Sequence, residues 1–284
     1  MKKLLLTGSS GFIGQYFIHT YAFKYNIKKF SFLNDNLALL KLDEIDTIIH
    51  LSALVHQMGG ATKEEYDRIN VEQTLALAKR AKESGVKHFI FMSTVKVYGE
   101  ETDTPYTEES ECLPQDDYGK SKLKAEQLLQ VLEDKNFMVS IIRTPIVYGF
   151  GVKANIKNLI NLIDKVPLLP FADIDNRRSM VYIGNLCYLL DVLVQYQKGG
   201  VFLASDDKSY STKELMFLIS KSLNKKLFLV KIPFFEMVLK KVKPDFHKRL
   251  YQSLELNNQW TKKELNLNNL YSFKRGIELT IHGK

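Results

Sequence analysis

Three glycines near the N-terminus constrain the fold of this chain more than any other feature. They lie at Gly8, Gly11 and Gly14, between the apolar run Lys3–Thr7 and a segment of helical period. Glycine tolerates positive φ and lets backbone N–H groups approach a phosphate, and a new helix N-terminus adds partial positive charge. The third glycine lets helix and strand pack closely. A glycine/serine turn without a ligand is the alternative, but the placement favours a dinucleotide pyrophosphate site.

Short apolar runs alternate with longer segments of helical period, which is typical of a parallel sheet covered on both faces. Strands are expected at Lys3–Thr7, Phe30–Leu33, Thr47–Ser52, His88–Ser93, Val139–Thr144 and Gly200–Ala204. Helices are expected at about Phe12–Tyr25, Lys63–Ser84 and Asp117–Asp134. The intervening Asn34–Asp46 leaves room for only a short helical turn.

This alternation predicts an α/β fold, a Rossmann-type doubly wound parallel sheet with a smaller C-terminal α/β lobe. After Gly149 the rhythm changes, and prolines and charged residues suggest a connection to another lobe. We expect residues 1–149 plus 181–204 to form the cofactor lobe, and residues 150–180 plus 205–284 to form the substrate lobe.

Positive charge is concentrated late in the chain. The formal net charge is +8, and between Lys221 and Leu250 nine Lys and Arg residues face only Glu236 and Asp245. A nucleic-acid-binding chain more often spreads basic residues over a whole face, so we expect no nucleic-acid partner. Phe228–Lys243 mixes aromatic residues with lysines. This fits either a membrane surface or a packed helix with a solvated basic face, and we favour the packed helix.

The two cysteines, Cys112 and Cys187, are far apart, so we expect neither a disulfide framework nor a metal site. The apolar start is too short for a signal peptide, and no run approaches the roughly 20 apolar residues of a membrane span. We therefore expect a cytoplasmic protein without an integral membrane segment.

Tyr118 and Lys122 stand one turn apart at the start of a predicted helix and so share one face. Lowering the pKa of a phenol from about 10 to about 7 requires about 4 kcal/mol. A cation about 4 Å away can supply this. Following a dinucleotide turn, the pair predicts a general acid/base rather than a solvated face. Thr94 directly follows the fourth predicted strand, at the end of the sheet where ligands bind, and offers a hydroxyl partner.

The glycine spacing, the Tyr118–Lys122 pair and the segment Arg143–Gly149 resemble the extended short-chain dehydrogenase/reductase (NAD-dependent epimerase/dehydratase) family, from the glycine turn to about Leu267. The resemblance implies NAD or NADP as cofactor, and catalytic roles for Thr94, Tyr118 and Lys122. The cofactor contacts that it implies are Gly8, Ser10, Gly11, Phe12, Ile13, Gly14, Asn34, Leu51, Ser52, Ala53, Asn70, Ser93, Tyr118, Lys122 and Pro145. The implied contacts of a UDP-sugar substrate are His56, Thr94, Asn155, Arg178 and Arg249.

Ser52–His56, Ser93–Glu100 and Gly151–Asn155 look like a subgroup named for UDP-glucose 4-epimerase. It includes reductases of UDP-4-keto-6-deoxy-N-acetylhexosamines from bacterial capsule and O-antigen pathways. In related 4,6-dehydratases an Asp-Glu pair follows the catalytic Thr, whereas this chain has Val95 and Lys96, so we do not expect a dehydratase.

Two C4 activities remain open, a 4-ketoreductase, which we favour, and a UDP-glucose or UDP-N-acetylglucosamine 4-epimerase. Asn34 stands where relatives often carry an acid for the adenosine ribose, which suggests a looser adenosine pocket and leaves NAD or NADP open. A non-catalytic dinucleotide sensor is a remote third reading, because a sensor has no use for a base. A homodimer fits the resemblance.

Overall fold

A six-stranded parallel sheet forms the centre of the structure, a computed structural model that describes residues 1–55, 61–153 and 155–283. The strands lie side by side in the order β2 (Asn26–Phe30), β1 (Lys3–Thr7), β3 (Thr47–His50), β4 (His88–Thr94), β5 (Met138–Thr144) and β9 (Gly200–Leu203). The strand order reverses between β1 and β3, and in open α/β sheets ligands bind at the carboxyl ends of the strands near such a switch point. The predicted doubly wound sheet is confirmed.

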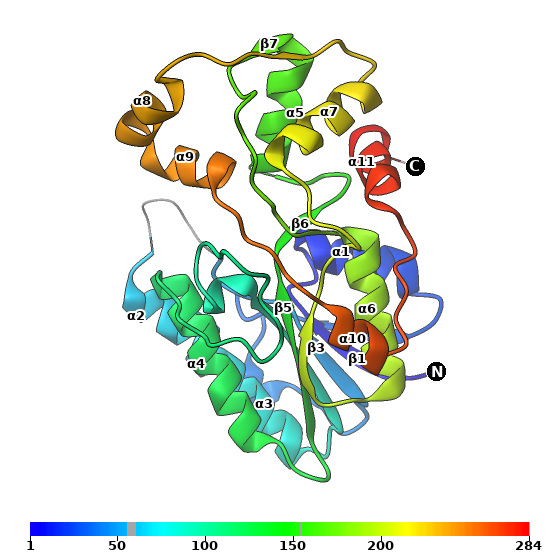
Figure 1. The fold of residues 1–284 in the computed structure, drawn as a ribbon. Coiled ribbons are helices and arrows are strands. Elements are labelled where there is room, and N and C mark those ends of the chain that lie inside the picture. The colour runs from blue at the N-terminus through cyan, green and yellow to red at the C-terminus, as the bar shows by residue number, and fades with distance from the viewer. Residues whose placement is uncertain (56–60, 154, 284) are drawn as a thin grey trace.

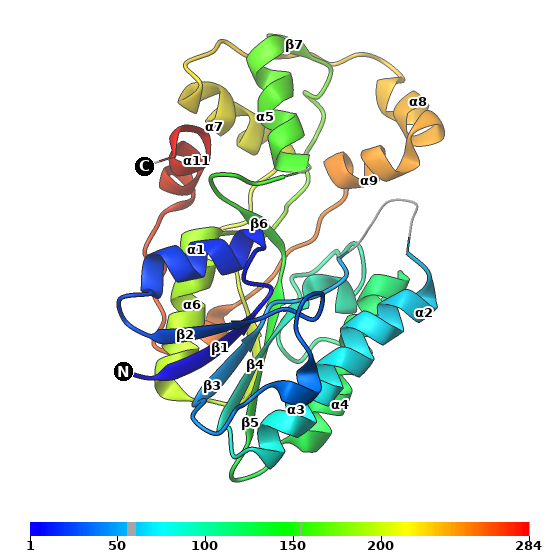
Figure 2. The same cartoon turned by 180° about the vertical axis from the view of Figure 1, so that it is seen from behind.

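Helices cover both faces because consecutive strand residues, which point to opposite faces of the sheet, are apolar. Leu4 and Leu6 of β1 belong to the cluster that includes residues of α1 (Phe12–Tyr21) and α6 (Ile183–Tyr196). These two helices lie together over one face of the sheet (Figure 2). Leu5 points the other way, toward α3 (Gln73–Glu83) and α4 (Asp117–Leu132). Each such leucine contributes roughly 1.5–3 kcal/mol by leaving water. The sheet is therefore packed on both faces beneath its carboxyl edge.

Before α3 the chain forms α2 (Lys63–Tyr66) and a π-helical stretch, η2 (Asp67–Glu72), so that one long helix carries a local widening. Two short 3₁₀ turns, η1 (Leu37–Leu39) and η3 (Val95–Val97), follow β2 and β4. The first of these confirms the predicted short turn between the second and third strands.

A second layer of elements lies above the carboxyl edge of the sheet (Figure 1). It contains the helices α5 (Asn155–Lys165), α7 (Thr212–Ser222), α8 (Phe235–Val242), α9 (Pro244–Tyr251) and α11 (Phe273–His282). Two short strand pairs accompany them, β6 (Ile146–Tyr148) with β8 (Met180–Tyr182), and β7 (Leu168–Leu169) with β10 (Phe228–Leu229).

One C-terminal helix, α10 (Gln259–Glu264), packs beside the main sheet instead. The backbone N–H of Leu203 donates to Thr261 Oγ1 at 2.9 Å, and the rings of Phe202 and Trp260 stack at 5.9 Å. The C-terminal tail thus covers the β9 edge before it returns to the upper layer as α11. Among the described residues, no helix is long and apolar enough to cross a bilayer.

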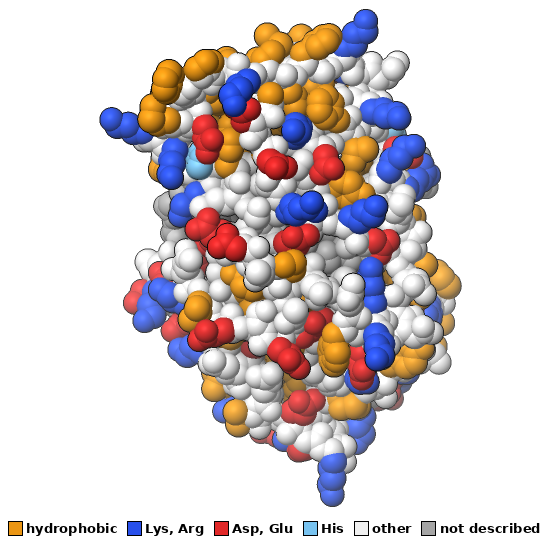
Figure 3. All heavy atoms as spheres, viewed as in Figure 1, with side chains coloured by type: hydrophobic (Ala, Val, Ile, Leu, Met, Phe, Trp, Pro, Cys, Tyr) orange, Lys and Arg blue, Asp and Glu red, His pale blue; other side chains and the backbone are white. Residues whose placement is uncertain are grey.

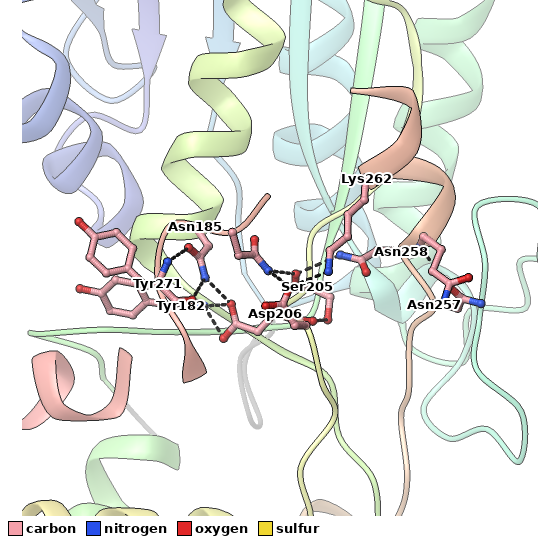
Figure 4. Close-up of polar contacts among 11 residues, drawn as sticks. Tyr182, Asn185, Ser205, Asp206, Asn257, Asn258, Lys262 and Tyr271 are labelled. Atoms are coloured by element: carbon pink, nitrogen blue, oxygen red, sulfur yellow. Dashed lines mark hydrogen bonds and ion pairs between the residues drawn. The ribbon is translucent and has the colours of Figure 1, made fainter. Parts of the chain in front are cut away.

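A buried carboxylate fixes the junction between the two layers. Asp206, just after β9, accepts hydrogen bonds from the Tyr148 hydroxyl at 2.6 Å and from Asn185 Nδ2 at 2.7 Å. It also accepts the backbone N–H of Tyr182 at 3.2 Å, and Asn185 in turn exchanges two hydrogen bonds with the backbone of Tyr271 (Figure 4). This network holds the parallel strand pair β6–β8 in place.

Some predicted boundaries are wrong. The second strand is Asn26–Phe30 rather than Phe30–Leu33, because it is an edge strand whose Lys28 and Lys29 face solvent, so its sequence is polar. The first helix ends at Tyr21 rather than Tyr25, and Tyr25 instead donates to Asp191 of α6 at 2.5 Å. The third strand ends at His50, two residues earlier than predicted.

Candidate active site

The glycine turn joins β1 to α1 in the geometry that its sequence predicts. Gly8 adopts φ +66°, and a Cβ there would lie 2.8 Å from the carbonyl carbon of Leu51. A Cβ at Gly14 would lie 2.4 Å from the Gly8 carbonyl oxygen. Gly11 is the N-cap of α1, and no side chain caps the helix there. Ser10, Phe12 and Ile13 complete the turn, with Ser10 exposed. The uncapped N–H groups leave this helix end able to receive an anion.

The end of β3 lies against this turn. Thr7 Oγ1 accepts the backbone N–H of Ser52 at 3.1 Å and contacts His50 Nδ1 at 2.8 Å, while His50 Nε2 contacts Thr74 Oγ1 at 2.9 Å. Burial, and secondarily the charge of Lys122, lowers the pKa of His50 to about 3, so the ring is neutral. His50 is therefore a packing group that fixes Leu51, Ser52 and Ala53 at the edge of the sheet, where all three stay half-buried.

Asn70 lies on the π-helical stretch η2, and its amide bridges two site segments. Its Oδ1 accepts the Leu54 backbone N–H at 2.8 Å, and its Nδ2 donates to the Leu54 carbonyl and to Ser121 Oγ, both at 3.0 Å. π-bulges are frequent at functional sites. The sequence identified Asn70 but predicted an uninterrupted α-helix. A π-helical turn contains one more residue than an α-helical turn, and the hydrophobic periodicity of the sequence does not reveal a single added residue.

Tyr118 and Thr94 meet at the carboxyl edge of the sheet. Tyr118 is half-buried in the first turn of α4, whose N-cap Asp116 accepts the Gly119 N–H at 2.7 Å. Burial, the charge of Asp116 and the nearby Tyr66 raise the pKa of the Tyr118 phenol, whereas a hydrogen bond with Thr94 opposes that rise. The ring of Tyr66 packs 6.0 Å from that of Tyr118, centroid to centroid. The two predicted hydroxyl groups are thus brought together.

The expected effect of Lys122 on this phenol is not observed. Lys122 is fully buried and its Nζ lies 3.8 Å from the centre of the Phe91 ring. Burial lowers the pKa of Lys122 to about 7, with Glu126 acting in the opposite direction. Without cofactor Lys122 does not contribute to the pKa of Tyr118, because its ammonium group is directed toward the Phe91 ring inside the sheet–helix layer. The predicted effect of Lys122 together with the charge of an oxidised nicotinamide stays a prediction.

A buried ion pair beneath the site was not predicted. Arg143 Nη2 donates to Glu126 Oε2 at 2.7 Å, and the guanidinium stacks over the Tyr98 ring at 4.6 Å. Ser93 donates to the other carboxylate oxygen of Glu126. The side chain of Ser93, predicted to contact cofactor, is therefore occupied by Glu126. The spacing of Glu126 four residues after Lys122 was a usable signal, since both fall on the buried face of one helix.

The other predicted cofactor residues lie on either side of this centre. Pro145 is buried between β5 and β6. Asn34 lies four residues beyond the end of β2, in an exposed turn. The turn borders a shallow pocket of about 650 Å³, which Arg68 and Gln73 line from the opposite side. The Asp35 carboxylate accepts the Ser31 N–H at 2.8 Å and so belongs to the turn itself.

Three predicted substrate residues line one cavity of about 740 Å³ between α5, α7 and α9. They are Asn155, Arg178 and Arg249, and Arg249 Nη1 donates to Asn155 Oδ1 at 3.3 Å. Burial and the charge of Arg249 lower the pKa of Arg178, whose Nη1 donates to the Gln252 carbonyl at 3.0 Å. Two adjacent guanidinium groups suit an anionic ligand such as a diphosphate.

Much of the remaining cavity wall is apolar. Sequence reasoning missed these residues, which come from five separate segments: Leu159, Leu162, Phe171, Met180, Leu215, Phe246 and Leu250. His56, a predicted substrate contact, lies outside the described residues. Among the described residues, no group of three or more His, Cys, Asp or Glu side chains is arranged to hold a metal ion.

The turn fits the predicted dinucleotide. Side chains at Gly8 and Gly14 would collide with backbone, and the helix end between them is uncapped, so this is a cradle for a pyrophosphate rather than a filled turn.

Three comparisons define the relatives of this chain. The chain is 34% identical to a UDP-glucose 4-epimerase of Vibrio cholerae, with 98% of this chain and 94% of the relative covered. It is 26% identical to a dTDP-4-dehydro-6-deoxyglucose reductase of Escherichia coli, with 78% and 82% covered. A crystal structure of a UDP-glucuronic acid 4-epimerase from Bacillus cereus in complex with NAD has the same fold, with a TM-score of 0.78 at 21% identity, covering 98% of this chain and 97% of that one.

The family model described as "NAD dependent epimerase/dehydratase family" matches residues 4–204, from β1 to the end of the sheet. That span contains the glycine turn, Thr94, Tyr118 and Lys122. With a match over most of the chain and a relative at 34% identity over nearly its whole length, the chain belongs to the NAD-dependent epimerase/dehydratase family, whose enzymes use NAD or NADP.

Proposed function

We propose that this NAD(P)-dependent enzyme reduces the C4 ketone of a UDP-4-keto-6-deoxy-N-acetylhexosamine. The observation that carries the proposal is the pairing of Tyr118 with Thr94 at the carboxyl edge of the sheet, below a cavity that holds Arg178 and Arg249. Under this proposal the arginines bind the diphosphate, and the hydroxyl pair receives the sugar. The product would serve capsule or O-antigen assembly, as the sequence resemblance implies.

The cofactor would lie along the glycine turn, with its pyrophosphate on the N-terminus of α1 and its adenosine beside Asn34. Bound NAD(P)H supplies the hydride that reduces C4. The Tyr118 hydroxyl donates its proton to the C4 oxygen, and the Thr94 hydroxyl orients that oxygen by a hydrogen bond. To contact the cofactor, the ammonium group of Lys122 would have to turn away from the Phe91 ring when the cofactor binds. By this reading residues 1–149 plus 181–204 are the cofactor lobe and residues 150–180 plus 205–284 the substrate lobe, with α10 packed across to the sheet.

The adenosine end of the site favours reduction over epimerisation. An epimerase must retain its cofactor, whereas a reductase must exchange its cofactor at every turnover. The exposed turn at Asn34 and its shallow pocket suit a cofactor that exchanges at every turnover.

A 4-epimerase is the second candidate, favoured by the 34% identity to the Vibrio cholerae epimerase. Dehydration is not supported. Val95 is buried, and Lys96 forms ion pairs with Asp116 and with Glu100, so no carboxylate follows Thr94 to serve C5 and C6.

The test compares the two activities in one purified sample. With a UDP-4-keto-6-deoxy-N-acetylhexosamine and NADH or NADPH, we expect loss of reduced-nicotinamide absorbance and one 4-hydroxy product. With UDP-glucose or UDP-N-acetylglucosamine and no added cofactor, we expect no interconversion. Tyr118→Phe is the inactive control. Interconversion of the UDP-sugars without added cofactor would show that the protein is an epimerase rather than a reductase. If neither reaction took place, both proposals would be refuted.

A further inference from the structure

We propose that the surface formed by α8 and the strand pair β7–β10 binds an anionic lipid bilayer. This inference concerns a surface remote from the hydroxyl pair, and its test needs no substrate. We call this surface the apolar rim. Its exposed apolar residues are Leu168, Phe228, Ile232, Phe234, Met237, Val238 and Val242.

The helix α8 is only half packed. Phe235 and Leu239, one turn apart, are half-buried and contact the main core, but α8 has no fully buried residue. Met237 is 62% exposed and Phe234, at the N-cap, 76% exposed. The prediction of a packed helix with a solvated basic face is therefore only half right, since apolar side chains also face solvent. Contiguous exposed apolar surface of this kind marks an interaction site.

The charge around the apolar rim selects the partner. Lys231, Lys240, Lys241, Lys243 and Lys248 are all exposed. Lys231 pairs with Asp173 at 3.0 Å and Lys248 with Glu100 at 3.6 Å, while Glu236 contacts His247 at 3.0 Å. The excess positive charge of this surface therefore comes from Lys240, Lys241 and Lys243. Figure 3 shows apolar side chains gathered over α8 and along the edge near β7, with Lys and Arg between them. Apolar groups interleaved with lysines match an anionic membrane surface better than a neutral one.

Phe234 provides an independent indication. It adopts φ +60°, a left-handed conformation that a bulky residue rarely takes, and places its ring at the start of α8. Glycine would adopt this φ without strain. Such strain at an exposed aromatic residue fits a side chain held outward to enter a bilayer.

The apolar rim also adjoins the substrate cavity. Val242 and Lys243, at the end of α8, line that cavity together with Phe246 and Arg249 of α9. A protein bound through α8 would hold its substrate cavity beside the membrane.

The experiment measures co-sedimentation of the intact protein with vesicles of phosphatidylcholine alone or mixed with phosphatidylglycerol. We expect binding to the mixed vesicles, weakened by salt, and little binding to the neutral ones. Phe234→Gly should be at least as stable as wild type yet bind several-fold more weakly. Lys240→Gln with Lys241→Gln should weaken binding by roughly 25-fold, at about fivefold for each lysine.

The matched controls are Val131→Ser and Lys135→Gln, both exposed near the end of α4, and they should bind like wild type. Equal binding of the Phe234→Gly and control variants, or no binding to mixed vesicles, would overturn the proposal. Sedimentation velocity tests whether a second copy of this chain covers the apolar rim instead of a bilayer. That assignment would follow if the wild type formed a dimer and did not bind vesicles, and if the Phe234→Gly variant were a monomer.

Discussion

Replacing Lys122 by Met should make the protein more stable at neutral pH while it abolishes turnover. Lys122 is fully buried, and burial lowers its pKa from 10.5 to about 7. That difference corresponds to about 5 kcal/mol, at about 1.4 kcal/mol per pKa unit. Because the folded state binds this proton more weakly than the unfolded state, the stability of the wild type rises as pH increases from about 7 toward 10.5.

The variant Lys122→Met lacks this penalty. After allowing about 1 kcal/mol for the lost contact with the Phe91 ring, we expect it to exceed the wild type by about 3 kcal/mol at pH 7. Near pH 9.5 the penalty falls to about 1 kcal/mol, so the advantage should nearly vanish. Glu126 keeps Ser93 and Arg143 as partners in the variant.

Urea unfolding at the two pH values measures the difference. Lys120→Met is the control, since Lys120 is exposed on the same helix, and it should change stability by less than about 0.5 kcal/mol at either pH. A variant at Lys122 that is less stable than wild type at pH 7, or a difference that does not change with pH, would refute the reasoning. The expected gain in stability of Lys122→Met would show that the buried Lys122 ammonium group is kept for function at a cost in stability.

Other substitutions test the remaining parts of the site. Tyr118→Phe should lower kcat by roughly 10²–10⁴-fold while cofactor affinity, measured by calorimetry, is unchanged; normal turnover would exclude Tyr118 as the acid. Gly14→Ala should abolish cofactor binding and lower stability by about 1–3 kcal/mol, because its Cβ would lie 2.4 Å from a backbone oxygen; unimpaired titration with NADH would contradict the cradle. Glu126→Ala should cost about 3–5 kcal/mol in urea unfolding, since it leaves Arg143 buried without a counter-charge; a loss below about 1 kcal/mol would argue against that ion pair. Arg249→Ala should raise KM for the sugar nucleotide roughly 10–100-fold with a smaller change in kcat, and an unchanged KM would remove it from the substrate site.

The sequence was most informative where local rules and the fold agree. The glycine turn, the sheet and the meeting of Thr94 with Tyr118 follow from one principle, that the carboxyl ends of parallel strands share an edge. Arg178 and Arg249 were matched by resemblance, and the structure brings both to one cavity.

The sequence was least informative where contacts between distant segments determine the position of a strand or the direction of a side chain. The strand β2 lies at the edge of the sheet, where Asn26, Lys28 and Lys29 are exposed, so its sequence lacks the apolar run that predicted the other strands. The direction of Lys122 depends on Phe91, which lies on another element. The helix α8 carries apolar side chains both toward the core and toward solvent. Its sequence does not show that Phe235 and Leu239 are the ones that pack, because this depends on the core residues that they contact.

The most direct measurement of the proposed chemistry follows one hydrogen atom. Reduced cofactor deuterated at the transferring carbon of its nicotinamide is incubated with the UDP-4-keto-6-deoxy sugar, and the product is analysed by NMR. Our account predicts deuterium at C4 of the product, delivered to a single face, and none when Tyr118 is replaced by Phe. A 4-hydroxy product without deuterium, or no product while the cofactor remains reduced, would contradict it.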